Sequence, residues 1–472
     1  MSASTTRHGR PSFDEAYRAD GTPRAHYEEL LGAIDGADLL ALRDAARQRV
    51  AAEGAGFGDE PFRIDPVPRL FTGQAWDALA DGLVQRVRAL NAFVADAYGA
   101  RRIVDAGVVP AELIDEAEGY QPELRGRLPP VAAPIAVAGP DVVYDEEGTL
   151  RVLEDNCRTP SGFCYAAATR RAVRASLALD GAGPRELCDP LRELVAGALR
   201  DAAPAGIDDP FAVVLSDGPG TASLWEHEQV ARLAGAQLVT LDDLRLRDGR
   251  LFARSPEGGR QRGARRVDVV YRRADGDRLR DAAGAPTAIA RLLLEPWLAG
   301  RLGLVNAFGT GIADDKLAHA HVDAMVRFYL GEESLLASVP TLDLGRPELL
   351  REVLDDLRAY VIKPRSGTGG RGVVVCAHAD EDTLAGVRDE LRRAPQRHVA
   401  QRTVALSLHP TVTAEGRLEP RHIDLRPFIF SGTGWTRALP GGLTRVALEP
   451  GTLVVNSSQH GGGKDTWVLR KS

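Results

Sequence analysis

The chain carries, at residues 152–162, the run Val152-Leu153-Glu154-Asp155-Asn156-Cys157-Arg158-Thr159-Pro160-Ser161-Gly162, in which a short apolar segment ends in a carboxylate–amide cluster. Side chains of a strand alternate between its two faces, so we predict that Glu154 and Asn156 share one face and Asp155 points to the other. Asp141 ends another short strand, and the turn at Glu147-Gly148 lets it face Glu154. Two carboxylates and an amide oxygen form a hard, all-oxygen set that suits Mg²⁺. An acidic turn on the protein surface is the alternative interpretation.

A glycine loop follows a lysine-bearing strand further along the chain. Residues 360–363 are predicted to form a strand that ends in Lys363, and the loop Gly367-Thr368-Gly369-Gly370-Arg371-Gly372 then satisfies G-x-G-x-x-G. A dinucleotide-binding fingerprint needs a helix directly after such a loop, whereas Val373-Val374-Val375 favours a strand. A flap between two strands can close its backbone amides over phosphates, because glycines leave them unobstructed. A glycine-rich hairpin without a ligand is the alternative.

Two lysines stand where they can meet an anion. Lys363 lies among apolar residues of its strand, which is unfavourable unless an anion compensates the charge. Lys316 stands at the start of a helix predicted to run from Asp315 to Leu330. The alternatives are an edge lysine that points to water for Lys363 and a solvated surface lysine for Lys316.

Length and composition restrict the class of protein. A chain of 472 residues with 44% hydrophobic and 26% charged residues is too long for one simple core, so two or three lobes are expected. The net charge of −7 argues against nucleic acid or an anionic membrane as the main partner. No apolar run approaches the roughly 20 residues that span a bilayer, and the N-terminus lacks an apolar signal-peptide core. Four cysteines without CxxC spacing indicate reduced thiols, so we expect a soluble, cytoplasmic protein.

The pattern of apolar and turn residues predicts the other elements. Helices are expected at residues 27–51 and 73–98, where apolar residues recur at three- and four-residue spacing. An α/β lobe with parallel pairing is indicated by the alternation of segments 211–215, 221–234, 237–241 and 267–271. Strands are also expected at 131–143, 149–153, 360–363 and 373–376, and segments 421–430 and 451–455 are assigned to the same antiparallel sheet. Glu226-His227-Glu228 are expected near the carboxyl end of a strand, where α/β proteins often bind ligands.

These segments resemble those of ATP-grasp ligases, but in the opposite order. An ordinary ATP-grasp chain carries its lysines and glycine loop first and its metal-binding residues last. The swapped order resembles the circularly permuted type 2 ATP-grasp family, which is related to glutathionylspermidine synthase and carries the motif V-L-E-D-N-x-R-T-P-S-G that residues 152–162 match throughout. Further segments that resemble the family extend the likeness over roughly residues 57–470: 68–69, 82–91, 267–273, 306–311, 424–427, 442–445 and 456–459. His460 departs from the family, which usually has glycine there.

The resemblance implies a mixed α/β fold, a circularly permuted ATP-grasp with an antiparallel nucleotide-binding core and an α/β lobe. We expect this division: a disordered N-terminus (1–20), for its polar composition, a helical segment packing on the core (21–130), metal-binding strands (131–200), the α/β lobe (201–310), and the lysines, flap and C-terminal strands (311–472). The implied metal ligands are Asp141, Glu154 and Asn156. The implied nucleotide-binding residues are Lys316, Lys363, Gly367, Thr368, Gly369, Gly370, Gly372 and Gln401, with the backbone of residues 398–401 meeting adenine. The candidate catalytic residues are Arg158, Arg426 and Arg445; the last two suit a γ-phosphate or acyl-phosphate, with a structural salt bridge as the alternative.

The resemblance also implies an ATP-dependent carboxylate–amine ligase that uses ATP and Mg²⁺ and forms an amide through an acyl-phosphate, releasing ADP and phosphate. Its partners would be a small-molecule or peptide carboxylate and an amine acceptor, without nucleic acid or membrane; a protein partner stays open. The alternatives are a catalytically inactive ATP-binding scaffold or sensor of the same fold and a small-molecule kinase. A nicotinamide oxidoreductase is disfavoured by the strand after the glycine loop.

Overall fold

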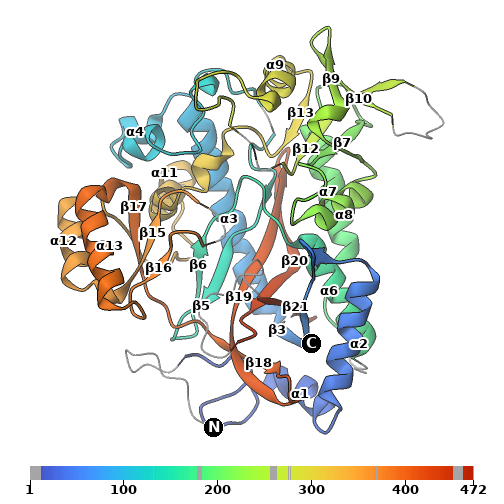
Figure 1. Cartoon of the computed structure of the whole chain (residues 1–472), viewed down its shortest axis with the longest axis vertical. Helices are drawn as coiled ribbons and strands as arrows, with labels where there is room; N and C mark the ends of the chain where they lie inside the picture. The colour runs from blue at the N-terminus through green and yellow to red at the C-terminus, as the bar shows by residue number, and fades with distance from the viewer. Residues whose placement is uncertain are drawn as a thin grey trace.

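An eight-stranded, largely antiparallel sheet forms the centre of the molecule (Figure 1). The computed structural model describes residues 12–130, 132–177, 183–255, 263–274, 276, 278–367, 370–449 and 461–470. Six strands follow one another in the order β3 (Ile64–Phe71), β21 (Gly462–Val468), β20 (Trp435–Val446), β19 (Leu418–Gly432), β5 (Asp141–Tyr144) and β6 (Leu150–Glu154), while β4 (Val137–Ala138) and β18 (Leu408–Val412) pair with β19. β3 and β21 run parallel, so strands from both ends of the chain complete this sheet.

A second, smaller antiparallel sheet carries Lys363. Its order is β14 (Thr341–Asp343), β17 (His398–Arg402), β15 (Tyr360–Pro364) and β16 (Val374–Val375). Helices α12 (Pro347–Asp355) and α13 (Glu381–Arg393) lie beside it, and their apolar side chains join its strands in a separate buried cluster (Figure 1). The prediction that all the C-terminal strands belong to one antiparallel sheet is therefore wrong, because β15 and β16 pair within this sheet and β19 within the central one. The strand predicted at 451–455 lies outside the described residues.

The α/β lobe is confirmed. Strands β13 (Gly303–Val305), β12 (Val269–Arg272), β7 (Ala212–Leu215) and β8 (Gln237–Val239) pair in this order, all parallel, and α7 (Cys188–Ala202) and α8 (Leu224–Ala234) pack against them. β9 (Leu244–Arg247), β10 (Arg250–Arg254) and β11 (Ala264–Arg266) form an antiparallel arm at the edge of this lobe (Figure 1).

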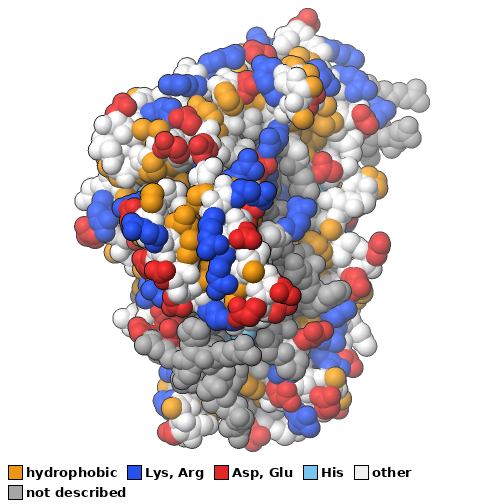
Figure 2. Space-filling view, turned by 60° about the vertical axis from the view of Figure 1, so that its left-hand side comes forward, with side chains coloured by type: hydrophobic (Ala, Val, Ile, Leu, Met, Phe, Trp, Pro, Cys, Tyr) orange, Lys and Arg blue, Asp and Glu red, His pale blue; other side chains and the backbone are white. Residues whose placement is uncertain are grey.

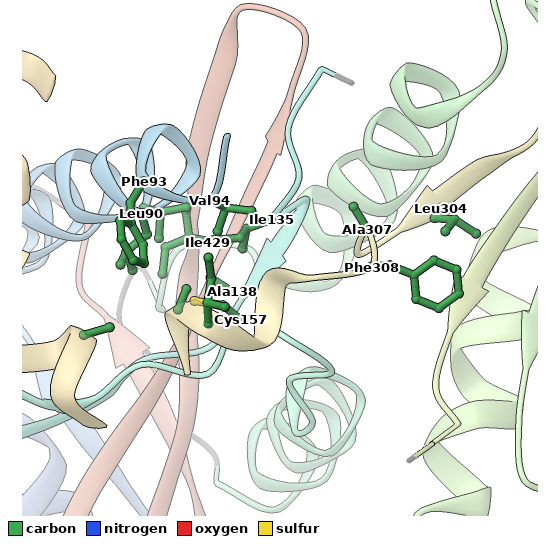
Figure 3. Close-up of a cluster of buried hydrophobic side chains, with 14 of the residues drawn as sticks. Leu90, Phe93, Val94, Ile135, Ala138, Cys157, Leu304, Ala307, Phe308 and Ile429 are labelled. Atoms are coloured by element: carbon green, nitrogen blue, oxygen red, sulfur yellow. The ribbon is translucent and has the colours of Figure 1, made fainter. Parts of the chain in front are cut away.

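Helix α3 (Gly73–Tyr98) spans the core and has the bounds predicted from the sequence. Thr72 caps its start by accepting a hydrogen bond from Ala75 N at 3.2 Å. Its apolar face packs in the largest buried cluster, where Leu90, Phe93 and Val94 meet residues of the central sheet and its neighbours (Figure 3). Leu304, Ala307 and Phe308 extend the same cluster towards the α/β lobe. One core thus joins α3, the central sheet and the lobe.

Two predictions near the N-terminus are corrected. The helix expected at 27–51 is split into α1 (Glu28–Ile34) and α2 (Leu39–Ala52), because Gly36 has a φ of +73° and Asp38 caps α2 by accepting from Ala41 N. Residues 12–20, expected to be disordered, are anchored by Glu15, which is buried and accepts two hydrogen bonds from Arg69 at 2.7 Å. Residues 1–11 lie outside the described residues.

The remaining helices and strands include one helix that packs on the central sheet and another that packs on α3. They are β1 (Gly56–Phe57), β2 (Glu60–Pro61), α4 (Arg102–Asp105), α5 (Glu112–Asp115), α6 (Phe163–Ser176), α9 (Glu295–Leu298), α10 (Lys316–Ala320) and α11 (Val322–Leu330). Among the described residues, none of these helices, nor any other, has the length and apolar content to cross a bilayer.

Candidate active site

The three predicted metal ligands come together at the end of the β5–β6 hairpin. Asp141 and Glu154 are partners in the strand register, and Asn156 follows two residues later. The Asn156 amide donates from Nδ2 to Gly139 O at 3.0 Å, and no described residue donates to its Oδ1. Asp155 points away and binds Arg86 instead, as the strand alternation predicts. Two carboxylates and an amide oxygen therefore lie together at one hairpin.

Both predicted catalytic arginines of the C-terminal strands bind Asp141. Arg426 donates from Nε and Nη2 at 2.6 and 2.8 Å, and Arg445 Nη2 lies 2.8 Å from Asp141 Oδ2. Burial alone would raise the pKa of the Asp141 carboxyl, but the two guanidinium groups hold it well below its usual range. Asp141 therefore stays an anion, and the arginines lie at the site within an ion-pair network.

Asp424 is a third carboxylate that the sequence interpretation missed as a site residue. It accepts hydrogen bonds from Arg445 and lies on β19 two residues before Arg426, a spacing that puts both side chains on one face. Burial raises its pKa to about 6 although Arg445 opposes the shift. The two-residue spacing between Asp424 and Arg426 is the sequence signal by which Asp424 could have been predicted as a site residue.

Lys363 is buried rather than an edge lysine that points to water. It is 8% exposed and donates from Nζ to Gln401 Oε1 at 2.6 Å. The pKa of Lys363 is lowered to about 8, and burial is the largest cause. The charges of Glu154 and Asp141 oppose this shift, and the charge of Lys316 adds to it. The lysines and the metal-ligand candidates therefore share one electrostatic neighbourhood, although they come from segments far apart in the sequence.

Lys316 is tied to the strand of Lys363. Its Nζ donates to Gly367 O at 3.2 Å, and its backbone N donates to Arg365 O at 3.1 Å. Arg365 also binds Asp315, which caps α10 by accepting from Leu317 N at 2.9 Å. The start of α10 and the start of the glycine loop are thus joined by both side chains and backbone.

The described glycines of the loop adopt backbone conformations that favour glycine. Gly367, Gly370 and Gly372 have φ values of +117°, +75° and +74°, which L side chains rarely adopt, and the strand β16 follows as predicted. Thr368 and Gly369 lie outside the described residues, as does His460.

The backbone of residues 399–401 is engaged within the small sheet, because these residues pair with β14 on one side and β15 on the other. The contact of residues 398–401 with adenine stays a prediction, and this pairing argues against it. The side chain of Gln401 instead bridges the two sheets, because Nε2 donates to Leu153 O at 3.1 Å while Oε1 accepts from Lys363. Gln401 therefore positions Lys363 beside the metal-ligand hairpin.

The loop after Asn156 is held from two sides. Arg158 lies near Asp314, with 3.8 Å between Nε and Oδ2, and the backbone N of Cys157 donates to Asp314. Glu226 is fully buried and accepts from the Gly162 backbone at 2.7 Å and from Arg273 at 3.1 Å. Glu226, expected near a ligand, is instead a buried anchor for the loop and for the start of α6.

The donor set fits Mg²⁺ together with an anionic ligand. Among the described residues no cluster of three His, Cys, Asp or Glu side chains could hold a metal alone, so the two carboxylates and Asn156 would need further oxygens from a bound ligand. Figure 2 shows Lys and Arg side chains along the middle of one face, with Asp and Glu side chains among them.

The sequence model of one family, described as circularly permuted ATP-grasp type 2, matches residues 68–447. An uncharacterized protein of Mycobacterium tuberculosis is 39% identical over 469 residues, which cover 97% of this chain and 84% of that protein. An uncharacterized protein of Synechocystis is 36% identical over 474 residues, covering 98% and 97%. A Frankia casuarinae protein named "Putative glutamate--cysteine ligase 2-2" is 40% identical over 481 residues, covering 98% of this chain and 54% of that protein.

A solved structure shares the fold. The glutathione synthetase-like effector of Globodera pallida, in its apo form, aligns with a TM-score of 0.57 and covers 91% of this chain and 97% of the effector. Its sequence identity is 12%, so the likeness concerns the fold alone.

Proposed function

The chain belongs to the circularly permuted ATP-grasp type 2 family and is an ATP-dependent ligase, and we propose that it joins a carboxylate to an amine through an acyl-phosphate. The observation that carries this proposal is the burial of Lys363 within electrostatic range of Glu154, Asp141 and Lys316. A buried cation next to carboxylates and a glycine loop suits a nucleoside triphosphate with its metal ion.

Each residue of the site has a role in this reaction. Lys316, Lys363 and the amides of the flap neutralise the ATP phosphates, and Gln401 holds Lys363 in place. Asp141, Glu154 and Asn156 would hold Mg²⁺, which supplies charge neutralisation between the phosphates. Arg426 and Arg445, which bind Asp141, would contact the transferred phosphoryl group, and Arg158 would approach it from the loop after Asn156. No protein nucleophile is needed, because positioning and charge supply most of the acceleration in phosphoryl transfer.

The chemistry has two steps. A carboxylate oxygen of the substrate bonds to the γ-phosphorus while the bond from that phosphorus to the bridging oxygen of ADP breaks. The amine nitrogen then bonds to the acyl carbon, phosphate leaves with the carbon–oxygen electron pair, and the nitrogen loses a proton to solvent. The flap would exclude water from the acyl-phosphate, because hydrolysis would waste the ATP.

The adenine would contact the connection between the two sheets. Residues 403–407 follow β17, and the hydroxyl of Thr403 is buried without a hydrogen-bond partner among the described residues. A small apolar cluster of Val143, Val339, Leu406 and Ala447 includes a residue of this connection. We assign the adenine to this segment in place of residues 398–401.

The substrate class follows from the relatives only in outline. A glutamate–cysteine ligase joins a carboxylate to an amine, which is the reaction type proposed for this chain. The chain covers 54% of the Frankia protein that has this name, so the two amino acids are not carried over.

The four cysteines are free, which agrees with a reducing cytoplasm, where ATP is also supplied.

The test is to incubate purified protein with Mg²⁺, ATP and pools of amino acids, short peptides and polyamines. We expect phosphate release together with a new mass that equals both substrates less water, and its loss in Lys363→Ala and Glu154→Ala. Hydroxylamine would trap the acyl-phosphate as a hydroxamate when the amine is left out. A phosphorylated product that resists amines would indicate a kinase, and nucleotide binding without turnover in every pool would indicate a scaffold or sensor.

A further inference from the structure

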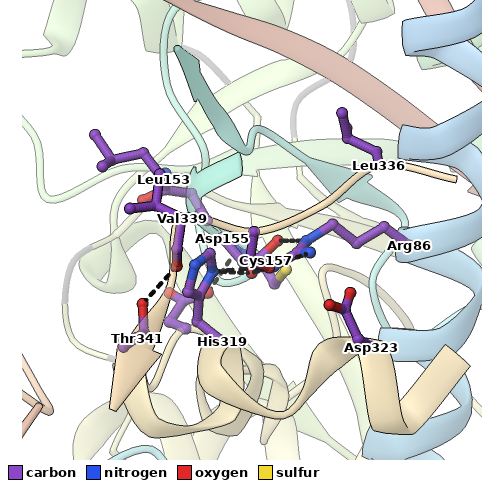
Figure 4. A network of polar contacts seen from close by, with 12 residues as sticks. Arg86, Leu153, Asp155, Cys157, His319, Asp323, Leu336, Val339 and Thr341 are labelled. Carbon is purple, nitrogen blue, oxygen red and sulfur yellow. Dashed lines mark hydrogen bonds and ion pairs between the residues drawn. The ribbon is translucent and has the colours of Figure 1, made fainter. Parts of the chain in front are cut away.

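Asp155, which lies between the two candidate metal ligands Glu154 and Asn156, is held by a buried fork of hydrogen bonds. Arg86 of α3 donates from Nε to Oδ1 and from Nη2 to Oδ2, both at 2.7 Å. His319 of α10 reaches Asp155 Oδ2 through Nδ1 at 3.0 Å, and the same nitrogen lies 2.9 Å from Arg86 Nη2. Figure 4 shows the three side chains converging from three different elements. Each is at most 4% exposed.

Stability alone does not account for this cluster. A buried ion pair gains about as much from its attraction as it loses in desolvation, and apolar residues of similar volume often serve as well. Burial lowers the pKa of His319, which favours the neutral ring, and its Nε2 has no partner among the described residues. A polar cluster of this kind inside the core formed by α3 is better explained by what it positions.

Asp155 directly follows β6 and His319 lies in α10, so the cluster joins the metal-ligand hairpin to the helix of Lys316. In an extended chain, fixing Asp155 on one face fixes the directions in which Glu154 and Asn156 leave the other face. His319 lies three residues after Lys316, so the same contact holds the helix that carries the phosphate-binding lysine. We propose that Asp155, Arg86 and His319 form a positioning unit that sets the separation between the metal ligands and Lys316. This inference rests on the proposed function.

A second arm of the same unit leads to Lys363. Arg86 Nη1 donates to Ser338 Oγ at 2.9 Å, and the neighbours of Ser338 pair with Val152 of β6. Thr341 donates to Val339 O at 2.9 Å and accepts from Gln401 Nε2 at 2.9 Å. Gln401 in turn accepts from Lys363, so hydrogen bonds connect Arg86 with both phosphate-binding segments.

The test measures metal binding without turnover. Mn²⁺ and the non-hydrolysable analogue adenylyl imidodiphosphate are added to the wild type and to Asp155→Asn, and free Mn²⁺ is followed by electron paramagnetic resonance. We expect Asp155→Asn to bind Mn²⁺ about 10- to 100-fold more weakly, the range typical for partners that orient metal ligands. Glu15→Gln is the matched control, because Glu15 accepts the same fork from the buried Arg69 at 2.7 Å. It should lose stability but keep the affinity of the wild type for Mn²⁺.

Variants of His319 test whether Asp155, Arg86 and His319 act as one unit or make independent contacts. His319→Leu removes Nδ1 and should weaken both Mn²⁺ and nucleotide binding, whereas His319→Asn keeps a polar atom near Nδ1 and should recover most of the affinity. In a cycle with Asp155→Asn, the effects should be non-additive by at least about threefold. An Asp155→Asn variant that binds Mn²⁺ within twofold of the wild type, or an additive cycle, would overturn the positioning unit alone. A wild type that binds no Mn²⁺ with the analogue would overturn the proposed function, and this inference with it.

Discussion

Lys363 is a buried cation whose charge depends on pH close to neutrality. Its pKa is lowered to about 8 by burial, so the ammonium group is largely present at pH 7 and is lost as the pH rises through 8. We therefore predict that the dissociation constant for ATP without Mg²⁺ rises above pH 8, by up to about tenfold per pH unit. Calorimetric titration from pH 6.5 to 9.5 measures it. Lys363→Arg keeps its charge over this range and should remove the dependence, so equal slopes in both proteins would contradict the assignment.

The residues of the site divide into those that spacing along a strand can predict and those that it cannot. Alternation predicted that Glu154 and Asn156 leave Asp155 on the other side, and the partners of Asp155 confirm it. The identity of those partners was not predictable, because Arg86 and His319 are 69 and 164 residues away in the chain. Glu226 was predicted to lie near a ligand because it follows a strand. Its burial was not predictable, because it depends on contacts with the distant segment around Gly162.

At the scale of elements, α3 shows how packing can reverse an intrinsic preference. Alanine favours a helix over glycine by about 1 kcal/mol, but a Cβ at Gly82 would lie 2.6 Å from the Cβ of Leu336. We predict that Gly82→Ala destabilises the protein by about 1–3 kcal/mol, the range for an overpacked core, as measured by urea unfolding. Gly386→Ala in α13 is the matched control: a Cβ there meets nothing within 4 Å, so this variant should be more stable. A stabilising Gly82→Ala would contradict the packing argument.

Elements were predicted well where their signals are local. The bounds of α3 follow from its cap and apolar period, and the parallel strands of the α/β lobe follow from alternation with helices. The split between α1 and α2 was missed although Gly36 and Asp38 are a stop and a start signal, because the apolar period continues across them. The two antiparallel sheets could not be separated, since strand period does not tell which strands pair.

At the scale of the whole molecule, the order of the segments predicted the permuted family, which the match over residues 68–447 confirms. The order did not show how the chain closes its central sheet. β3 and β21, from opposite ends of the chain, pair in parallel, and Lys464 of β21 binds Asp65 of β3 inside the core. Asp14 also forms a parallel β-bridge with Leu408, the first residue of β18. The beginning of the chain is thus part of the same body as the C-terminal strands.

This closure predicts that the N-terminal segment is needed for stability. Deletion of residues 1–24 removes Glu15 and leaves Arg69, which is 0% exposed, as an unpaired charge in the core. Breaking such a buried pair costs about 3–5 kcal/mol, so the midpoint of urea unfolding should fall clearly. Adding Arg69→Met to the deletion removes the unpaired charge and keeps most of the volume, so part of the stability should return. An unchanged midpoint after deletion would show that residues 12–24 do not stabilise the sheet. If Arg69→Met does not restore any stability, the loss comes from the other contacts of the segment, because only the ion pair depends on the charge of Arg69.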